Sequence, residues 1–190
     1  MGTTIQLACA SIGTHDAWTL TAGATKVIAV AQPDDDATTV IRTSTLNAKQ
    51  SFNLDNLPGG ASAIVSVTTV ARFNESAASA TTMRAFLLLS AVTENGTTRN
   101  PGAAYTTYSE AIAKPGGGTW SVADVNALEV GVEEVADSTE TAGCTTLYVE
   151  VVYDSAGSDF AVFLTSFLPP LLAAWEGVKT CLRSFWTQPA

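Results

Sequence analysis

Between residues 128 and 154, two stretches alternate apolar and polar residues with a period of two. The stretch 145–154 (TTLYVEVVYD) alternates between an apolar set and a set that includes Glu150 and Asp154. This alternation is typical of a β-strand with one buried and one wet face. The stretch 128–135 alternates likewise, and Gly131 on its polar side indicates a bulge or the close approach of another backbone. We expect these stretches to be two central strands of one sheet, joined by the polar loop 136–143.

Short runs of β-branched and apolar residues also fill the earlier part of the chain, with Gly, Pro, Asn and Asp between them. Asn95-Gly96 predicts a hairpin turn, and 121–126 predicts one capped helical turn with Asp124 at its third position. Eight to ten strands with such turns indicate an all-β fold, an antiparallel β-sandwich of the jelly-roll type. The further predicted strands are 5–10 (an edge strand), 18–21, 26–31, 38–45, 50–54, 63–73, 83–92 (a central strand) and 105–113.

The chain changes character at Phe160, where a largely apolar and aromatic stretch begins. After the proline pair 169–170, the apolar residues fall at helical spacing. We therefore expect a β-sandwich domain at 1–157 and an apolar helical docking tail at 158–190, which packs against a neighbouring subunit or on its own sandwich. A membrane span is not expected, because it needs about 20 apolar residues without such interruptions. The predicted interface residues are Phe160, Phe163, Phe167, Leu171, Leu172, Trp175, Val178, Leu182, Phe185 and Trp186.

Charge is sparse: charged residues make up 14% of the chain, and the net charge is −9. Because phosphate binding needs clustered Lys and Arg, and the nine basic residues are scattered, we do not expect a nucleic-acid partner. Three widely spaced cysteines, Cys9, Cys144 and Cys181, match neither a disulfide framework nor a zinc site, so we expect reduced thiols. The N-terminus lacks the basic and apolar regions of a signal peptide, which indicates synthesis in a cytoplasm.

Candidate catalytic groups are few. Glu129 and Glu133 share one face of a predicted strand at about 13 Å, from the ~3.3 Å rise per residue. This separation exceeds the ~5–5.5 Å between the carboxyls of a retaining glycosidase. His15 is the only histidine, and its neighbours in sequence do not make a triad, so we expect it at the surface or in a turn. We expect no enzyme activity and no cofactor.

Three further stretches admit a binding role beside a structural one. Asp34, Asp35 and Asp36 could ligate calcium, although they lack the spacing of a calcium loop and a solvated turn is favoured. The glycines 116–118 predict a turn, because no Lys-Ser/Thr pair of a phosphate loop follows them. Trp120, Tyr105 and Tyr108 could stack on a sugar, but packing in the core or at an interface is favoured.

A pattern of positions over residues 18–154 resembles a recurring domain of tailed-bacteriophage virion proteins and their prophage relatives. The resemblance implies a jelly-roll or concanavalin-like sandwich, assembled in many copies as a capsid or tail component. The residues that carry it are Asp34-Asp35-Asp36-Ala-Thr-Thr, Phe52-x-Leu54, Leu57-Pro58, Ile64-x-x-Val67, Ala71-Arg72, Gly118-x-Trp120-x-x-Ala-Asp124-Val-Asn126-x-Leu128-x-x-Gly131-Val132 and Leu147-Tyr148-Val149-Glu150-Val151.

On these grounds we expect a non-enzymatic structural protein of a bacteriophage virion, made in the host cytoplasm. A capsid decoration protein or another minor capsid component is the first hypothesis, with other virion proteins and copies of itself as partners. The alternative is a carbohydrate-binding module of a tail fibre or appendage, with a glycan as partner.

Overall fold

The computed structural model describes residues 2–31, 38–76, 81–136 and 140–156, which hold ten strands and two short helices. No helix in these ranges is long and apolar enough to cross a membrane. The elements are β1 Thr3–Asp16, β2 Thr19–Ala22, α1 Lys26–Ala31, β3 Val40–Thr43, β4 Lys49–Leu54, β5 Ala61–Glu75, β6 Thr82–Leu89, β7 Val92–Asn95, β8 Thr106–Glu110, α2 Val122–Asn126, β9 Glu129–Ala136 and β10 Ala142–Ser155.

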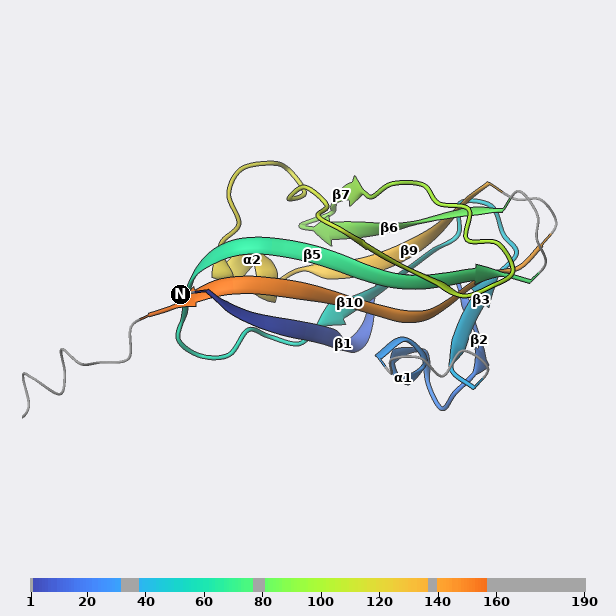
Figure 1. Ribbon diagram of the computed structural model, residues 1–190, viewed down its shortest axis with the longest axis horizontal. Coiled ribbons are helices and arrows are strands. Elements are labelled where there is room, and N and C mark those ends of the chain that lie inside the picture. Colours follow the sequence, from blue (N-terminus) through green and yellow to red (C-terminus); the bar gives the residue numbers. More distant parts are fainter. Residues whose placement is uncertain (1, 32–37, 77–80, 137–139, 157–190) are drawn as a thin grey trace, which may run out of the picture. The chain divides into compact units, whose positions relative to one another are not determined.

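The strands form two antiparallel sheets whose inner faces share one hydrophobic core (Figure 1). In sheet A, β10 lies between β5 on one side and β1 and β3 on the other, with β8 outside β5 and β2 outside β3. Sheet B has the order β1-β4-β9-β6-β7. The predicted all-β antiparallel fold is confirmed, and its layers are consistent with a β-sandwich. The predicted docking tail and its interface residues, Phe160 to Trp186, lie outside the described residues.

Strand β1 belongs to both sheets. Its first half pairs with β10, from Thr3 opposite Tyr153 to Ala8 opposite Tyr148. Its second half, from Cys9 onward, pairs with β4 in sheet B. β3 takes the place of β1 beside β10 at residues 142–144. A fork therefore opens along one side of β10, and α1 packs against β10, β1 and β3 there.

The core follows the predicted alternation of β10. Leu147, Val149 and Val151 are fully buried between the sheets. Trp18, just before β2, is 1% exposed, and its indole nitrogen donates a hydrogen bond to the Ala48 carbonyl at 3.0 Å. Because a buried indole N–H without an acceptor would cost free energy, this bond lets the largest side chain of the core lie inside it.

The expectation that β9 and β10 belong to the same sheet is wrong. β9 lies between β4 and β6 in sheet B, whereas β10 is central in sheet A. Both strands are central, as expected, but they belong to opposite layers. A period of two reports which face of a strand is buried, and it carries no information about the strand's partners.

Residues 26–31 form helix α1, and the predicted strand there is wrong. Thr25 begins the helix: its carbonyl accepts from Ala29 N at 2.9 Å, and its hydroxyl accepts from Ile28 N at 3.1 Å. The consecutive residues Ala29 and Val30 are both buried. A short apolar run such as KVIAVA fits a buried strand or a buried helical turn equally well, so its periodicity could not decide.

The predicted strand 83–92 is interrupted by a hairpin. Ser90 and Ala91 both take positive φ, 50° and 67°, as the two central residues of a type I′ turn require. They join β6 to β7, so the turn predicted at Asn95-Gly96 is wrong: Gly96 follows the end of β7 and lies against Glu110 and Ile112. β6 is buried on both faces, as expected for a central strand.

Helix α2 has the predicted cap. Ser121 Oγ accepts from Asp124 N at 3.1 Å, and Asp124 Oδ2 accepts from Ser121 N at 2.8 Å. Lys114 Nζ lies 2.8 Å from the same carboxylate oxygen, and the hydrogen bonds from Lys114 and Ser121 lower the pKa of Asp124 to about 2. Asn126 Oδ1 accepts from Leu57 N at 2.9 Å, which fixes the other end of α2 to the loop after β4.

The Asp124→Asn variant should lose stability in a pH-dependent way. The folded-state pKa lies below the ordinary value of 3.8, so the carboxylate's contribution is present above about pH 4 and is lost as the pH falls through about 2. We expect the variant to lose about 0.5–1 kcal/mol near pH 6, as for a lost helix cap, and to approach the wild type near pH 2. Urea unfolding at both pH values, with Asp154→Asn as the control, measures this. An equal difference at both pH values would contradict it.

Candidate functional site

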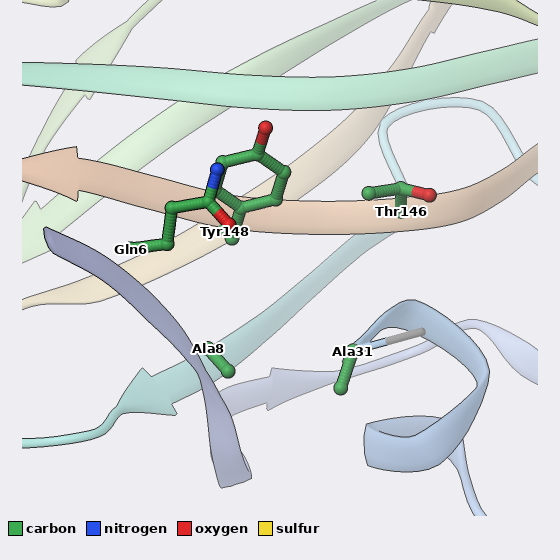
Figure 2. Close-up of a pocket in the computed structure, with 5 residues that line it drawn as sticks. All are labelled: Gln6, Ala8, Ala31, Thr146 and Tyr148. Carbon is green, nitrogen blue, oxygen red and sulfur yellow. The ribbon is translucent and has the colours of Figure 1, made fainter. Parts of the chain in front are cut away.

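A hollow of about 170 Å³ opens at the fork in sheet A, where β1 has left β10 and β3 has not yet joined it. Gln6 and Ala8 come from β1, Thr146 and Tyr148 from β10, and Ala31 from the end of α1. In Figure 2, Gln6 and Tyr148 lie on one side of the hollow, and Thr146 and Ala31 lie on the other. The hollow therefore exists because one strand serves two sheets.

The side chains of the hollow combine a flat aromatic ring, two methyl groups and two uncommitted polar groups. Within the described ranges, no hydrogen bond joins the Gln6 amide or the Tyr148 hydroxyl to another side chain or to the backbone. Burial, and secondarily the nearby Glu150 carboxylate, raise the pKa of Tyr148. The phenol is thus neutral at physiological pH, and it can both donate and accept.

The hollow suits a small ring-shaped ligand with hydroxyl groups. Its volume is below the ~300 Å³ at which pockets for drug-sized molecules begin. The five lining residues include no carboxylate, histidine or thiol. Such a set can hold a ligand by contact and hydrogen bonding.

The aromatic residues singled out in the sequence do not gather into one platform. Trp120 is half-buried and packs against the core. Tyr108 faces inward, where its ring lies 6.0 Å from that of Phe73. Tyr105 lies at the edge of sheet A, where its hydroxyl accepts from Arg42 Nη2 at 3.0 Å. The aromatic residue of the hollow is Tyr148. In the sequence it stands out only as a single aromatic residue on the polar face of a predicted strand.

The carboxylates Glu129 and Glu133 lie on the outer face of sheet B, and each has partners there. Glu129 accepts hydrogen bonds of 2.6–2.7 Å from Ser51 Oγ and from Thr14 N and Oγ1. Although burial acts to raise it, these bonds hold the pKa of Glu129 below its usual value. Glu133 lies 2.7 Å from Arg84 Nη2 and 3.8 Å from Lys49 Nζ. Both carboxylates thus join strands of their own sheet.

The remaining candidates that the structure describes do not gather into a metal site. His15 is half-buried, with its ring 6.0 Å from that of Phe86. Cys9 and Cys144 are free and buried, and burial raises the pKa of both thiols, that of Cys144 to about 12. The glycines 116–118 all have positive φ, as a turn of this kind requires. Asp34, Asp35, Asp36 and Cys181 lie outside the described ranges, and inside them no group of three acidic, histidine or cysteine residues could hold a metal.

Comparisons with known proteins leave the family open. No family model matches the chain, and a search of curated proteins finds no match. Among solved structures, the CBM36-1 domain of a multidomain xylanase from the hindgut metagenome of Trinervitermes trinervoides is 15% identical, with a TM-score of 0.42 over 83% of this chain and 100% of that domain.

Two other solved structures are similar at the same low level. A family two carbohydrate esterase from Cellvibrio japonicus is 7% identical, with a TM-score of 0.36 over 83% of this chain, which spans 37% of that enzyme. A CBM4 structure is 15% identical, with a TM-score of 0.33 over 73% of this chain and 94% of the other. TM-scores below 0.5 are too low to base an argument on, so the function is inferred from the chain's own residues.

Proposed function

We propose that this chain is a non-enzymatic binding module and that it holds a carbohydrate on the outer face of sheet A. The hollow at the fork carries this proposal. There the Tyr148 ring and the Gln6 amide lie beside the methyl groups of Ala8 and Ala31. A sugar ring has the complementary surface, because one of its faces presents C–H groups and its rim presents hydroxyls.

The polar groups of the hollow match what a sugar offers. Each sugar hydroxyl donates one hydrogen bond and accepts others, and the Gln6 amide and the Tyr148 hydroxyl can each do both. Thr146 contributes to the lining between them and the end of α1. A ligand with only acceptor groups or only apolar groups would leave part of this capacity unused, at a cost in free energy.

Replacing Tyr148 with alanine should weaken carbohydrate binding by about 10- to 100-fold, because loss of an aromatic contact residue commonly costs about 1.4–3 kcal/mol. The measurement starts with a glycan array of the full chain and continues with calorimetry on the hits. Tyr148→Phe, which keeps the ring, should lose less. Val92→Ala, at an exposed position of sheet B, is the control for a remote substitution. An array without hits, or unchanged affinity in Tyr148→Ala, would contradict the proposal.

A second candidate is a structural component of a bacteriophage virion, a capsid decoration protein or another minor capsid component. It rests on the sequence resemblance, and the structure gives the residues that carry it the following places. Asp124 caps α2, Asn126 ties α2 to Leu57, and Gly131 lets β9 pack beneath Phe86. These residues thus have structural roles within the sandwich.

The virion candidate has its own test. Mass spectrometry of a purified particle should find the chain in many copies. Deleting residues 160–190 should abolish assembly and leave the sandwich folded, as judged by its circular dichroism. A truncated chain that still assembles would rule out the tail as the assembly contact, and absence from the particle would rule out the candidate.

A further inference from the structure

The outer face of sheet A has opposite charges on the two sides of the hollow. Along β10, Tyr148 is followed on this face by Glu150, which pairs with Gln6 of β1. In the other direction along β10 comes Thr146, which pairs with Arg72 of β5. Both residues lie on this same outer face. A ligand in the hollow therefore has a carboxylate beyond one end and a guanidinium beyond the other.

The basic side is larger than one residue. Arg42 of β3 donates from Nη2 to the Tyr105 hydroxyl at 3.0 Å, and the Arg72 guanidinium lies 5.8 Å from the centre of the Tyr105 ring. Arg42 forms no ion pair with any acidic residue of the described ranges. Among the described residues, the Arg42 charge is thus not neutralised by an ion pair, and it leaves a cation for a ligand.

In the part of the chain that the structure describes, two buried polar atoms at this place have no hydrogen-bond partner. They are Arg42 Nη1, a donor, and Asn74 Oδ1, an acceptor. Asn74 is only 5% exposed. Arg42 and Asn74 lie opposite Gly143 on the two strands that flank β10. Both atoms occupy the space that a side chain at position 143 would need, and Arg42 Nη1 would lie 2.9 Å from a Cβ built there. Buried polar groups are almost always paired, so these two point to a missing partner with an acceptor and a donor.

We propose that the ligand of this face is an acidic glycan, which extends from the hollow toward Arg72 and Arg42 and places a carboxylate-bearing sugar there. The inference rests on the proposed carbohydrate function. A guanidinium fork matches the two oxygens of a carboxylate, and a hydroxyl of the same sugar supplies the donor for Asn74. Glu150 repels the carboxylate from the opposite end, and this repulsion sets the direction of the chain.

The distances permit this arrangement. Five residues of β10 separate Tyr148 from Gly143, about 16 Å at ~3.3 Å per residue. More than one sugar ring is therefore needed to reach from the hollow to Arg42. Because Nη1 is covered from solvent, the guanidinium must turn outward about its flexible stem to reach a ligand. A buried donor without a partner costs free energy, and the turn relieves this cost. Screening over about 10 Å at 0.1 M salt limits the influence of the distant acidic residues.

The test compares two ligands with one backbone, an oligogalacturonate and its methyl ester, on the full chain. The acid should bind at least about 10-fold more tightly than the ester at low salt, and added salt should reduce this advantage. Arg42→Gln should lower the affinity for the acid at least about 5-fold and leave the affinity for the ester unchanged. Arg42→Lys, which keeps the charge, should retain part of the affinity for the acid. Lys49→Gln, on the outer face of sheet B, is the control for loss of a charge, because Glu133 keeps its closer partner Arg84 in that variant.

The outcomes separate this inference from the function on which it rests. Equal binding of acid and ester, or an Arg42→Gln variant that behaves as the wild type, overturns the acidic assignment and leaves the carbohydrate function standing. If Arg42→Gln loses binding of both the acid and the ester, Arg42 has a role in the fold, and the acidic assignment is again overturned. Tighter binding of a sulfated oligosaccharide than of the acid refutes the carboxylate. Failure of every glycan to bind the wild type overturns both proposals.

Discussion

Replacing Gly131 with valine should lower the free energy of unfolding by about 3 kcal/mol or leave the chain unfolded, because overpacking a tight site without room to relax costs at least 1–3 kcal/mol. Gly131 lies in the middle of β9, between β4 and β6. A Cβ at this position would come within 2.6 Å of the Gln50 carbonyl oxygen and of Phe86 Cε1. The backbone atom cannot move away cheaply, and Phe86 is completely buried.

Gly59→Ala is the matched control for this substitution. A Cβ at Gly59 would meet no atom within 4 Å, and its φ is not in the left-handed region. Alanine there should change stability by less than about 1 kcal/mol, with a gain if the unfolded chain loses freedom. Urea unfolding followed by tryptophan fluorescence measures both variants. A Gly131→Val protein as stable as Gly59→Ala would show that β9 and Phe86 can separate without cost.

Trp18→Ala should cost about 3–5 kcal/mol, the range for removal of a fully buried large aromatic side chain. Trp18 is 1% exposed, and its backbone and side chain bond to β4 and the turn before it: Trp18 N donates to Gln50 Oε1 at 3.3 Å, and the indole nitrogen donates to Ala48 O at 3.0 Å. Alanine would leave a cavity in the core beside β4 and remove one of the two hydrogen bonds to the Ala48 carbonyl, which also accepts from Glu134 N.

Trp18→Phe separates the two parts of this effect. Phenylalanine fills most of the space and lacks the N–H donor, so we expect a loss of about 1–3 kcal/mol from the lost indole hydrogen bond and the smaller ring. Chemical unfolding of the three proteins at one pH gives the comparison. Equal losses in the two variants would mean that the hydrogen bond, and not the packing, holds Trp18 in place.

The sequence predicts this fold well where the signal is local. The alternation of Leu147, Val149 and Val151 correctly identified the buried face of β10, and Ser121 and Asp124 correctly predicted the cap of α2. Gly131 indicated a close approach of backbone, and the structure puts the Phe86 ring and the Gln50 carbonyl there. Sheet membership was not predictable, because the pairing of β9 with β4 and β6 depends on contacts between distant segments.

The candidate site lay beyond sequence reasoning for a similar reason. Tyr148 has no motif around it, and its hollow exists only because β1 diverges from β10 after Ala8. The unpaired atoms of Arg42 and Asn74 meet over Gly143 because three strands from different parts of the chain lie in register. By contrast, Glu129 and Glu133 were correctly placed on one strand face, where both proved to have partners.

The pairing of β1 with β10 joins nearly the first residue of the domain to nearly its last, Thr3 to Tyr153. During synthesis, the opening strand must therefore wait for almost the whole domain to leave the ribosome before half of its ladder can form. Such distant pairing gives a high contact order, and domains of this kind fold in milliseconds to seconds. Until the closing strand arrives, the nascent chain carries an unmatched β-edge, which makes this interval the one in which a chaperone or a neighbouring nascent chain has most access to it.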